Sequence, residues 1–344
     1  MPPDFEPFHQ NRPHMNLPGT TRSNILVFRP LPPDQLARLQ AVHSVTVADP
    51  RRAGEVEAFN AALATADGLI GSSYPVNAAL LARAPQLKVV SSVSVGVDNY
   101  DLAALKARGI TLCHTPGVLT ETTADTIFSL VLASSRRVVE LANHVREGRW
   151  SANIGESLFG RDVHGKTLGL LGFGRIGQAV ARRAALGFGM PVLFANRSAV
   201  DLQAAAPDLA GKARQVPQDQ LLAQADIVVA VLALTPQTRH LMNAQAFARM
   251  KPGAVFVNGA RGDIVDEPAL LQALDSGHLF AAGLDVFATE PLPLDSPLRT
   301  HPKVTPLPHI GSATFETRHA MAEMATTNLL NALAGVPPLA VFEG

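Results

Sequence analysis

Three ionisable residues in the second half of the chain each follow a stretch that is typical of a buried strand. Arg261 follows AVFVNGA, Glu290 closes AAGLDVFATE, and His309 follows KVTPLP. Because ligands of an open α/β sheet bind beyond the carboxyl ends of its strands, we expect all three side chains to face one crevice. Taken singly, each has an ordinary interpretation as a surface charge or a structural histidine. Their shared position makes them candidates for catalysis.

The three residue types suit the reduction of a 2-oxo acid by hydride transfer. The guanidinium of Arg261 can bind the substrate carboxylate and polarise the keto group. His309 can donate the proton that the forming alkoxide requires. A hydrogen bond from its imidazole to Glu290 would fix the ring and stabilise its protonated form. We therefore expect Arg261 to serve both substrate binding and catalysis.

A glycine-rich turn supplies a candidate cofactor site. Gly172, Gly174 and Gly177 have the spacing G-x-G-x-x-G, with TLGLL as a strand before them and RIGQAVARRAAL as a helix after them. In that context the glycines allow a tight turn, close approach of a pyrophosphate and close helix packing. Arg175 and Ile176 begin the helix, whose first amide groups would hold the phosphates. The alternative is a plain strand–helix turn without a ligand.

The position that reads the cofactor ribose carries no acid. NAD-binding folds place Asp or Glu about 20 residues after the first glycine, at the end of the second strand. Here that strand, PVLFA, is followed by Asn196, Arg197 and Ser198. Arg197 can pair with a 2′-phosphate, and its two neighbours can donate hydrogen bonds to it. The sequence therefore predicts NADP(H) rather than NAD(H), unless Arg197 is only a solvated surface charge.

The elements that must position these residues follow a repeating strand–helix pattern. Apolar runs alternate with segments of helical spacing, which predicts an α/β protein with two doubly wound parallel-sheet domains. The longest helical pattern covers 119–147, with Thr120 as capping chemistry at its start. The final pattern, SATFETRHAMAEMATTNLLNALAG, predicts a helix that returns to the first half. The expected strands are 24–28, 44–48, 67–71, 87–91 and 110–113, then 167–171, 191–195, 226–234, 254–258, 281–286 and 303–307; the expected helices of the second half include 175–186, 236–250 and 266–276.

Composition narrows the classes of function. The chain has 344 residues, 47% of them apolar, and its 29 basic and 29 acidic side chains leave no net charge. This balance argues against nucleic acid or an acidic membrane as a partner. No apolar run approaches the roughly 18–20 residues of a membrane span, and the histidines lack metal-binding spacing, so we expect neither membrane nor metal. With Cys113 as the only cysteine, we expect a cytoplasmic protein.

Four longer stretches resemble the signatures of one enzyme family. GLLGFGRIGQAVARRA, VNGARGDIVDEPALLQAL, AAGLDVFATEPLP and PHIGSAT are similar to those of the D-isomer-specific 2-hydroxyacid dehydrogenases. The resemblance covers nearly all of the chain after residue 23. It implies a Rossmann domain for the cofactor, a flavodoxin-like domain for the substrate, and the Arg/Glu/His machinery on Arg261, Glu290 and His309.

The resemblance also implies further site residues. Asp285 would contact the nicotinamide carboxamide, and Thr123 would lie on the nicotinamide side of the cofactor. The stretch SSVSVGVDNYD resembles the substrate loop, in which the backbone amides of Val95 and Gly96 would hold the carboxylate. An aromatic residue such as Trp150 would reach a partner subunit, which implies a homodimer.

The expected domains are a flexible tail at 1–22, a substrate-binding domain at 23–118 and 311–344, and an NADP-binding domain at 119–310. Met15, inside the tail, is a candidate start. Within the family, GRWSANIGESLFGRDVHGKTLGLLGFGRIGQ and FANRS are most similar to NADPH-preferring bacterial reductases of glyoxylate, hydroxypyruvate and 2-keto-D-gluconate. Arg318 and His319 are candidates for contact with the polyol tail of a sugar acid.

Two other functions remain open at this point. One is an NAD-linked D-2-hydroxyacid dehydrogenase with another substrate, which the residues at 196–198 disfavour. Formate dehydrogenase shares the fold, but Glu290 argues against it. The other is a dinucleotide-sensing protein of the corepressor type, which would not need a complete Arg/Glu/His set.

Overall fold

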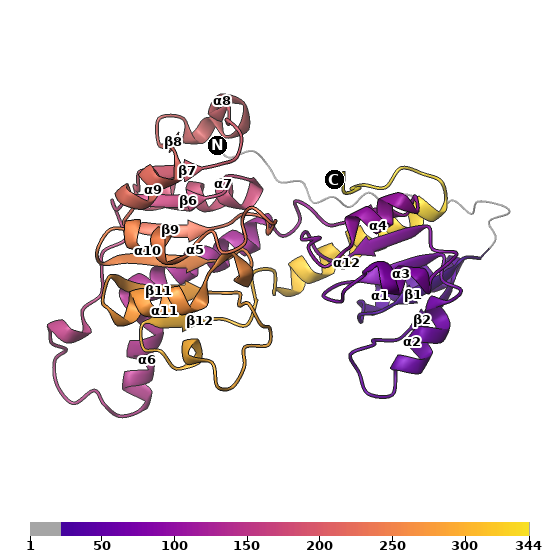
Figure 1. Cartoon of the computed structure of the whole chain (residues 1–344), viewed down its shortest axis with the longest axis horizontal. Coiled ribbons are helices and arrows are strands. Elements are labelled where there is room, and N and C mark those ends of the chain that lie inside the picture. The colour runs from indigo at the N-terminus through magenta and orange to yellow at the C-terminus, as the bar shows by residue number, and fades with distance from the viewer. Residues whose placement is uncertain (1–21, 344) are drawn as a thin grey trace.

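The computed structural model describes residues 22–343, so the expected tail and the candidate start at Met15 lie outside the described residues. The chain forms two lobes that lie side by side, each built around one parallel sheet (Figure 1). The hydrophobic clusters of the two sheets share no buried residue, so each lobe has its own core.

The first lobe contains a five-stranded sheet in the order β2-β1-β3-β4-β5. All its pairings are parallel, and β1, β3 and β4 are almost wholly buried, as expected for strands covered by helices on both faces. This order is the flavodoxin-like one that the sequence predicts. The elements are β1 (Asn24–Val27), α1 (Pro33–Val42), β2 (Ser44–Val47), α2 (Val56–Leu63), β3 (Gly68–Gly71), α3 (Ala78–Ala82), β4 (Val89–Ser92), α4 (Leu102–Ala107) and β5 (Thr111–Cys113).

The second lobe contains a seven-stranded parallel sheet in the order β12-β11-β10-β9-β6-β7-β8. This is the doubly wound arrangement expected of a dinucleotide-binding fold, with one strand more than the six that the sequence predicts. The additional strand is β8 (Ala213–Gln215), which the sequence does not reveal because only Ala213 is buried. The other strands are β6 (Leu168–Leu171), β7 (Val192–Ala195), β9 (Ile227–Ala230), β10 (Ala254–Asn258), β11 (Leu279–Leu284) and β12 (Val304–Pro306).

The prediction of a single long helix at 119–147 is wrong. The structure has two helices, α5 (Thr120–Arg136) and α6 (Val138–Arg146), separated by Arg137 in the left-handed conformation with φ of 55°. The Arg137 guanidinium donates to Glu140 at 2.6 and 2.8 Å, which holds the bend. The expected cap is also wrong, because Leu119 occupies the cap position and no side chain caps the helix.

Two further elements are shorter than the sequence predicts. The expected helix at 236–250 is shorter, because Asn243 caps it by accepting hydrogen bonds from Gln245 and Ala246, while His240 has φ of 50°. The expected strand at 226–234 ends at Ala230. The remaining elements are η1 (Glu156–Leu158), α7 (Arg175–Arg182), the π-helix η2 (Arg183–Gly187), α8 (Leu202–Ala205), η3 (Pro207–Leu209), α9 (Gln218–Gln224), α10 (Ala244–Arg249), η4 (Gly262–Ile264), α11 (Glu267–Asp275), η5 (Pro297–Arg299) and α12 (Phe315–Leu333).

The last helix returns to the first lobe, as the sequence predicts. In Figure 1, α12 runs from the region between the lobes across the first sheet. It packs on that sheet, where Ser91 donates to the carbonyl of Ala325 at 2.7 Å, and Thr317 shares a 2.5 Å hydrogen bond with Thr122 of α5. Among residues 22–343, no helix has the length and apolar character needed to cross a bilayer.

Candidate active site

The glycine turn has the geometry of a phosphate-binding loop. Gly172 has φ of 99°, and a Cβ there would lie 2.5 Å from the carbonyl oxygen of Val231. A Cβ at Gly177 would lie 2.5 Å from the carbonyl oxygen of Gly172, so this glycine lets α7 pack against the turn. These two positions therefore exclude any side chain for reasons of backbone packing.

Gly174 differs from its two neighbours because it faces open space. No heavy atom lies within 4 Å of the position that its Cβ would occupy, and it caps α7 without any side-chain hydrogen bond. The first amide groups of α7 are thus left for a ligand. Arg175 is exposed and Ile176 is half-buried beside them. The residues of this turn fit the pyrophosphate of a dinucleotide.

The three residues at the expected ribose position lie in an exposed loop after β7. Asn196 donates to the carbonyl of Ser198 at 3.2 Å. Gln215 of β8 fastens the loop, since it donates to the same carbonyl at 2.9 Å and accepts from the amide of Val200. Sequence reasoning missed Gln215 because it missed β8. Arg197 forms no ion pair with any residue of 22–343.

The acid closest to this loop in the sequence already has hydrogen-bond partners. Asp201 caps α8, where its carboxylate accepts hydrogen bonds from the amides of Gln203 at 3.0 Å and Ala204 at 3.3 Å. A capping carboxylate is held against its own helix rather than directed at a ribose. Among the described residues the loop therefore offers a guanidinium without an ion-pair partner, and the carboxylate that follows it in the sequence caps a helix.

His309 and Glu290 form a hydrogen-bonded pair. Nδ1 of His309 lies 2.8 Å from Oε2 of Glu290, and the amide of Phe287 donates to Oε1 at 3.1 Å. Burial alone would raise the pKa of Glu290, but these two hydrogen bonds, with the charges of His309 and Arg261, outweigh it and lower the pKa. Glu290 is therefore ionised at neutral pH, and Nδ1 of the imidazole must be the donor.

The backbone at His309 is held in an unusual conformation. Its φ is 54°, which costs a residue with a side chain conformational energy. Asp285, only 3% exposed, fixes this loop, because its two carboxylate oxygens accept hydrogen bonds from the amides of Ile310 at 2.7 Å and Gly311 at 2.8 Å. Burial raises the pKa of Asp285, against the opposing effect of these hydrogen bonds.

Thr123 lies against the same loop. A Cβ at Gly311 would lie 3.2 Å from both Cγ2 of Thr123 and Oδ2 of Asp285. Thr123 is buried on α5, one helical turn from the cap of that helix. The structure thus brings Thr123 and Asp285 together beneath the loop that carries the histidine.

Arg261 reaches from the second lobe to the substrate loop of the first. Its Nε donates to Asp98 at 3.0 Å, and its Nη1 donates to the carbonyl of Ala260 at 2.8 Å. A Cβ at Gly96 would overlap its Nη2 atom, so a side chain there would displace the guanidinium from its place over this loop. Sequence reasoning missed Asp98, although it stands inside the quoted stretch SSVSVGVDNYD.

Two polar backbone groups of the substrate loop have partners within the first lobe. The amide of Gly96 donates to Oγ of Ser94 at 3.1 Å, so it already has an acceptor. The carbonyl of Val95 accepts from Nδ1 of His114 at 3.2 Å. A carboxylate at Gly96 would therefore replace the serine hydroxyl as acceptor.

Comparison with known proteins identifies the family of this chain. Residues 128–311 match the family model of the D-isomer specific 2-hydroxyacid dehydrogenase NAD binding domain. The chain is 51% identical over 315 residues to glyoxylate/hydroxypyruvate reductase B of Citrobacter koseri, covering 91% of this chain and 96% of that protein. It is 49% identical over 318 residues to the Escherichia coli K12 protein of the same name, with the same coverage of both chains.

Solved structures show the same fold over almost the whole chain. A protein of Thermus thermophilus superposes with a TM-score of 0.84 at 44% identity, covering 93% of this chain and 99% of that one. The NADPH-dependent glyoxylate/hydroxypyruvate reductase of Sinorhizobium meliloti, in complex with NADP and malonate, has a TM-score of 0.81 at 29% identity, covering 94% and 97%. The chain therefore belongs to the D-isomer specific 2-hydroxyacid dehydrogenase family and is an NAD(P)-dependent oxidoreductase.

Proposed function

We propose that the protein reduces a short 2-oxo acid, namely glyoxylate, hydroxypyruvate or 2-keto-D-gluconate, to the 2-hydroxy acid with NADPH. The observation that carries this proposal is the Glu290–His309 hydrogen bond of 2.8 Å at the edge of the sheet that also carries the glycine turn. Relatives about 50% identical over 91% of the chain are named glyoxylate/hydroxypyruvate reductases, which supports the substrate class.

The mechanism assigns one task to each side chain. A nicotinamide held near Thr123 and Asp285 would supply the hydride for the keto carbon. Arg261 binds the carboxylate and polarises the keto oxygen, and the contact with Asp98 aims its guanidinium at the substrate loop. The protonated His309 donates the proton from Nε2 to the oxygen that becomes the hydroxyl. Glu290 holds Nδ1 and stabilises the imidazolium before transfer.

The NADP preference rests on the loop at 196–198. Arg197 is exposed, lies beside two hydrogen-bonding residues and has no described carboxylate partner. A guanidinium in this position attracts a 2′-phosphate and gains little from a ribose hydroxyl. Gly172, Gly174 and Gly177 would hold the pyrophosphate with Arg175 and Ile176, while Thr123 and Asp285 would lie at the nicotinamide end.

We assign residues 23–118 and 311–344 to substrate binding and 119–310 to cofactor binding. Arg261 is then the catalytic residue that touches both units, since its contacts are to Asp98 and Gly96. This arrangement would let closure of the lobes bring the substrate loop onto the reacting atoms. A cytoplasmic location accords with the only cysteine, Cys113, whose thiol is buried with its pKa raised to about 11.

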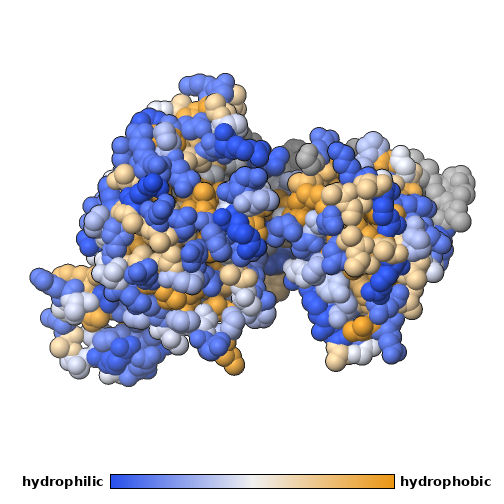
Figure 2. Space-filling model, viewed as in Figure 1, coloured by the Kyte–Doolittle hydropathy of each residue, from blue (hydrophilic) through white to orange (hydrophobic). Residues whose placement is uncertain are grey.

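We further propose a homodimer formed through α6 and the segment that follows it. This part projects from the second lobe (Figure 1), and apolar atoms lie exposed there among hydrophilic ones (Figure 2). Trp150 is 62% exposed, which is unusual for an aromatic residue without a partner. The other exposed apolar residues of α6 and the segment that follows it are Val138, Val139, Val145, Ile154 and Phe159.

The direct test of the function is a spectrophotometric assay of NADPH consumption with glyoxylate and hydroxypyruvate. Turnover with either substrate, and a lower KM for NADPH than for NADH, is the expected result. A clear NADH preference would contradict the cofactor assignment. Absence of turnover with every short 2-oxo acid would favour the dinucleotide-sensing alternative.

A further inference from the structure

A cavity of about 750 Å³ lies beyond the carboxyl ends of the first sheet, and the mechanism above does not use it. Arg29 follows β1, Ser72 follows β3 and Val93 follows β4, and all three line the cavity. In the sheet order β2-β1-β3-β4-β5 the direction of winding changes between β1 and β3. Open α/β sheets bind ligands at this switch point, and the volume suits a small molecule.

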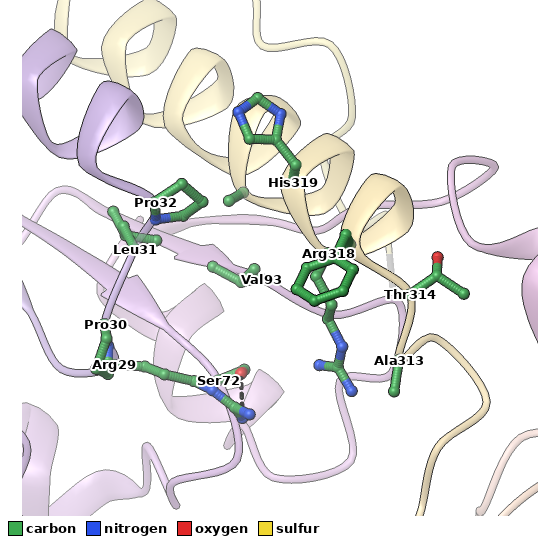
Figure 3. A pocket seen from close by; sticks show the side chains of 12 residues that line it. Arg29, Pro30, Leu31, Pro32, Ser72, Val93, Ala313, Thr314, Arg318 and His319 are labelled. Atoms are coloured by element: carbon green, nitrogen blue, oxygen red, sulfur yellow. Dashed lines mark hydrogen bonds between the residues drawn. The ribbon is translucent and has the colours of Figure 1, made fainter.

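Two guanidinium groups face this cavity. Figure 3 shows Arg318 extending from α12 toward Arg29 and Ser72, while His319 points away from them. Arg29 donates to the hydroxyls of Ser72 and Ser73, each at 3.0 Å. None of the twelve residues that line the cavity is acidic. Two positive charges thus line the cavity, and no carboxylate lines it with them.

The half-buried Arg318 has unused donors. Its guanidinium makes no side-chain hydrogen bond or ion pair with any residue of 22–343, although an arginine carries five N–H donors. Burial lowers the pKa of Arg29, and the charges of Arg318 and Arg51 lower it further. An anion between Arg29 and Arg318 would relieve this repulsion and satisfy the free donors.

Other charged groups near the cavity already have partners. The charge of Asp49 acts on Arg29, but its carboxylate is bound by Arg51 with two hydrogen bonds of 2.8 Å. The charge of Asp285 acts on Arg318, but its two oxygens accept hydrogen bonds from the amides of Ile310 and Gly311. Asp34 accepts a hydrogen bond from Nε2 of His319 at 2.8 Å, and the His319 ring points away from the guanidinium groups. The two arginines therefore form the only cationic pair among the lining residues.

The cavity adjoins the active site. Val93 lies within the substrate-loop stretch SSVSVGVDNYD, and Ala313 and Thr314 line the cavity only a few residues after the catalytic histidine. Thr314 also caps α12, so the first amide groups of that 19-residue helix add partial positive charge on this side. The charge of Asp285, which holds the loop of the catalytic histidine, also acts on Arg318.

We propose that Arg29 and Arg318 form a subsite for a second anionic group on the substrate, so that the enzyme also reduces 2-oxo dicarboxylates. This inference rests on the proposed function, because it places the far end of the same substrate. The paired guanidinium groups favour a carboxylate over the neutral polyol tail of a sugar acid, since each carboxylate oxygen can accept charge-assisted hydrogen bonds from both arginines.

The test compares substrates of equal carbon number that differ in the distal charge. We would measure kcat/KM with NADPH for oxaloacetate against 2-oxobutyrate and for 2-oxoglutarate against 2-oxopentanoate. We expect at least one dicarboxylate to be preferred by about tenfold or more, the effect of one charge-assisted hydrogen bond. Equal values for both pairs, or a preference for 2-keto-D-gluconate that depends on Arg318, would overturn the proposal.

Substitutions of the two arginines test whether they cause the dicarboxylate preference. Arg318→Met should reduce the dicarboxylate preference about tenfold, Arg318→Lys should retain part of it, and Arg29→Met should act like Arg318→Met. Arg52→Met is the matched control, because Arg52 is exposed on a neighbouring loop and does not line the cavity. Equal losses for dicarboxylate and neutral substrates would overturn the subsite. If Arg29→Met fails to fold, Arg318→Met decides alone.

A binding measurement separates this proposal from the proposed function. Titration calorimetry of 2-oxoglutarate and 2-oxopentanoate into wild type and Arg318→Met gives the same comparison without turnover. Reduction of glyoxylate with no charge preference in either measurement would overturn only the subsite. A charge preference in binding that Arg318→Met removes would support the subsite even if no 2-oxo acid were turned over, which would overturn only the proposed function.

Discussion

Nδ1 of His309 lies 2.8 Å from Oε2 of Glu290, and the histidine backbone has φ of 54°. The pair is partly open to solvent, with the imidazole 46% and the carboxylate 36% exposed. A left-handed conformation at a residue with a side chain marks a position that its surroundings hold in place. Here the buried carboxylate of Asp285 holds the histidine loop by accepting hydrogen bonds from the amides of Ile310 and Gly311.

His309→Ala should lower kcat by about 10²–10⁴-fold, because the proton donor is lost. NADPH affinity should stay close to wild type, since the glycine turn is untouched. Stopped-flow turnover and fluorescence titration of NADPH measure the two quantities separately. Activity near wild type would show that another group donates the proton.

Glu290→Gln should change how stability depends on pH. Because the pKa of Glu290 is lowered from its ordinary value of 4.5, the ionised carboxylate stabilises the folded state above that value, and this stabilisation is lost as pH falls through the lowered pKa. The stability difference between wild type and Glu290→Gln should thus be largest near neutral pH and shrink below about pH 4.5. Urea denaturation at several pH values tests this, and a difference that grows toward acid would contradict it.

Asp285→Asn should destabilise the loop that carries the histidine. Each carboxylate oxygen of Asp285 accepts one of the Ile310 and Gly311 amides, and in asparagine an NH₂ donor would replace one of these two oxygens and face an N–H group. We expect a loss of about 1–3 kcal/mol in the free energy of unfolding, together with a lower kcat. Asp219→Asn, at an exposed surface ion pair, is the control and should change neither quantity.

Alanine at the three glycines of the turn should separate stability from cofactor binding. Gly172→Ala and Gly177→Ala should each destabilise the fold by about 1–3 kcal/mol, because a Cβ would meet backbone oxygen at 2.5 Å. Gly174→Ala should leave stability unchanged and weaken NADPH binding, since its Cβ would enter the open space over α7. Gly187→Ala, also in open space but away from the turn, should affect neither. Unchanged NADPH affinity in Gly174→Ala would argue against the phosphate site.

Arg197→Ala should raise the KM for NADPH by about tenfold and leave the KM for NADH nearly unchanged, because only the 2′-phosphate contact is removed. Steady-state kinetics with both cofactors measures the ratio. Arg249→Ala, an exposed arginine on α10, is the control. Equal changes for both cofactors would assign Arg197 a general role instead of phosphate recognition.

Local patterns in the sequence were enough to predict several features of this protein. The G-x-G-x-x-G spacing between an apolar run and a helix located the turn at Gly172, and strand periodicity placed both parallel sheets and the return of the last helix. These features depend on residues that are close together in the sequence, so their spacing can be recognised without the structure. Strand β8 could not be predicted, because only one of its residues is buried. The bend at Arg137 could not be predicted either, because it depends on contacts with Glu140 and with the carbonyl of Ser157.

The tertiary structure alone decided which distant residues meet. Asp98 and Arg261 are 163 positions apart, and Gly96 lies under the same guanidinium. Arg29 and Arg318 come from opposite ends of the chain and reach one cavity only because α12 packs back on the first sheet. Long-range packing of this kind leaves no periodic signal in the sequence, because it is set by how whole elements fill space against one another.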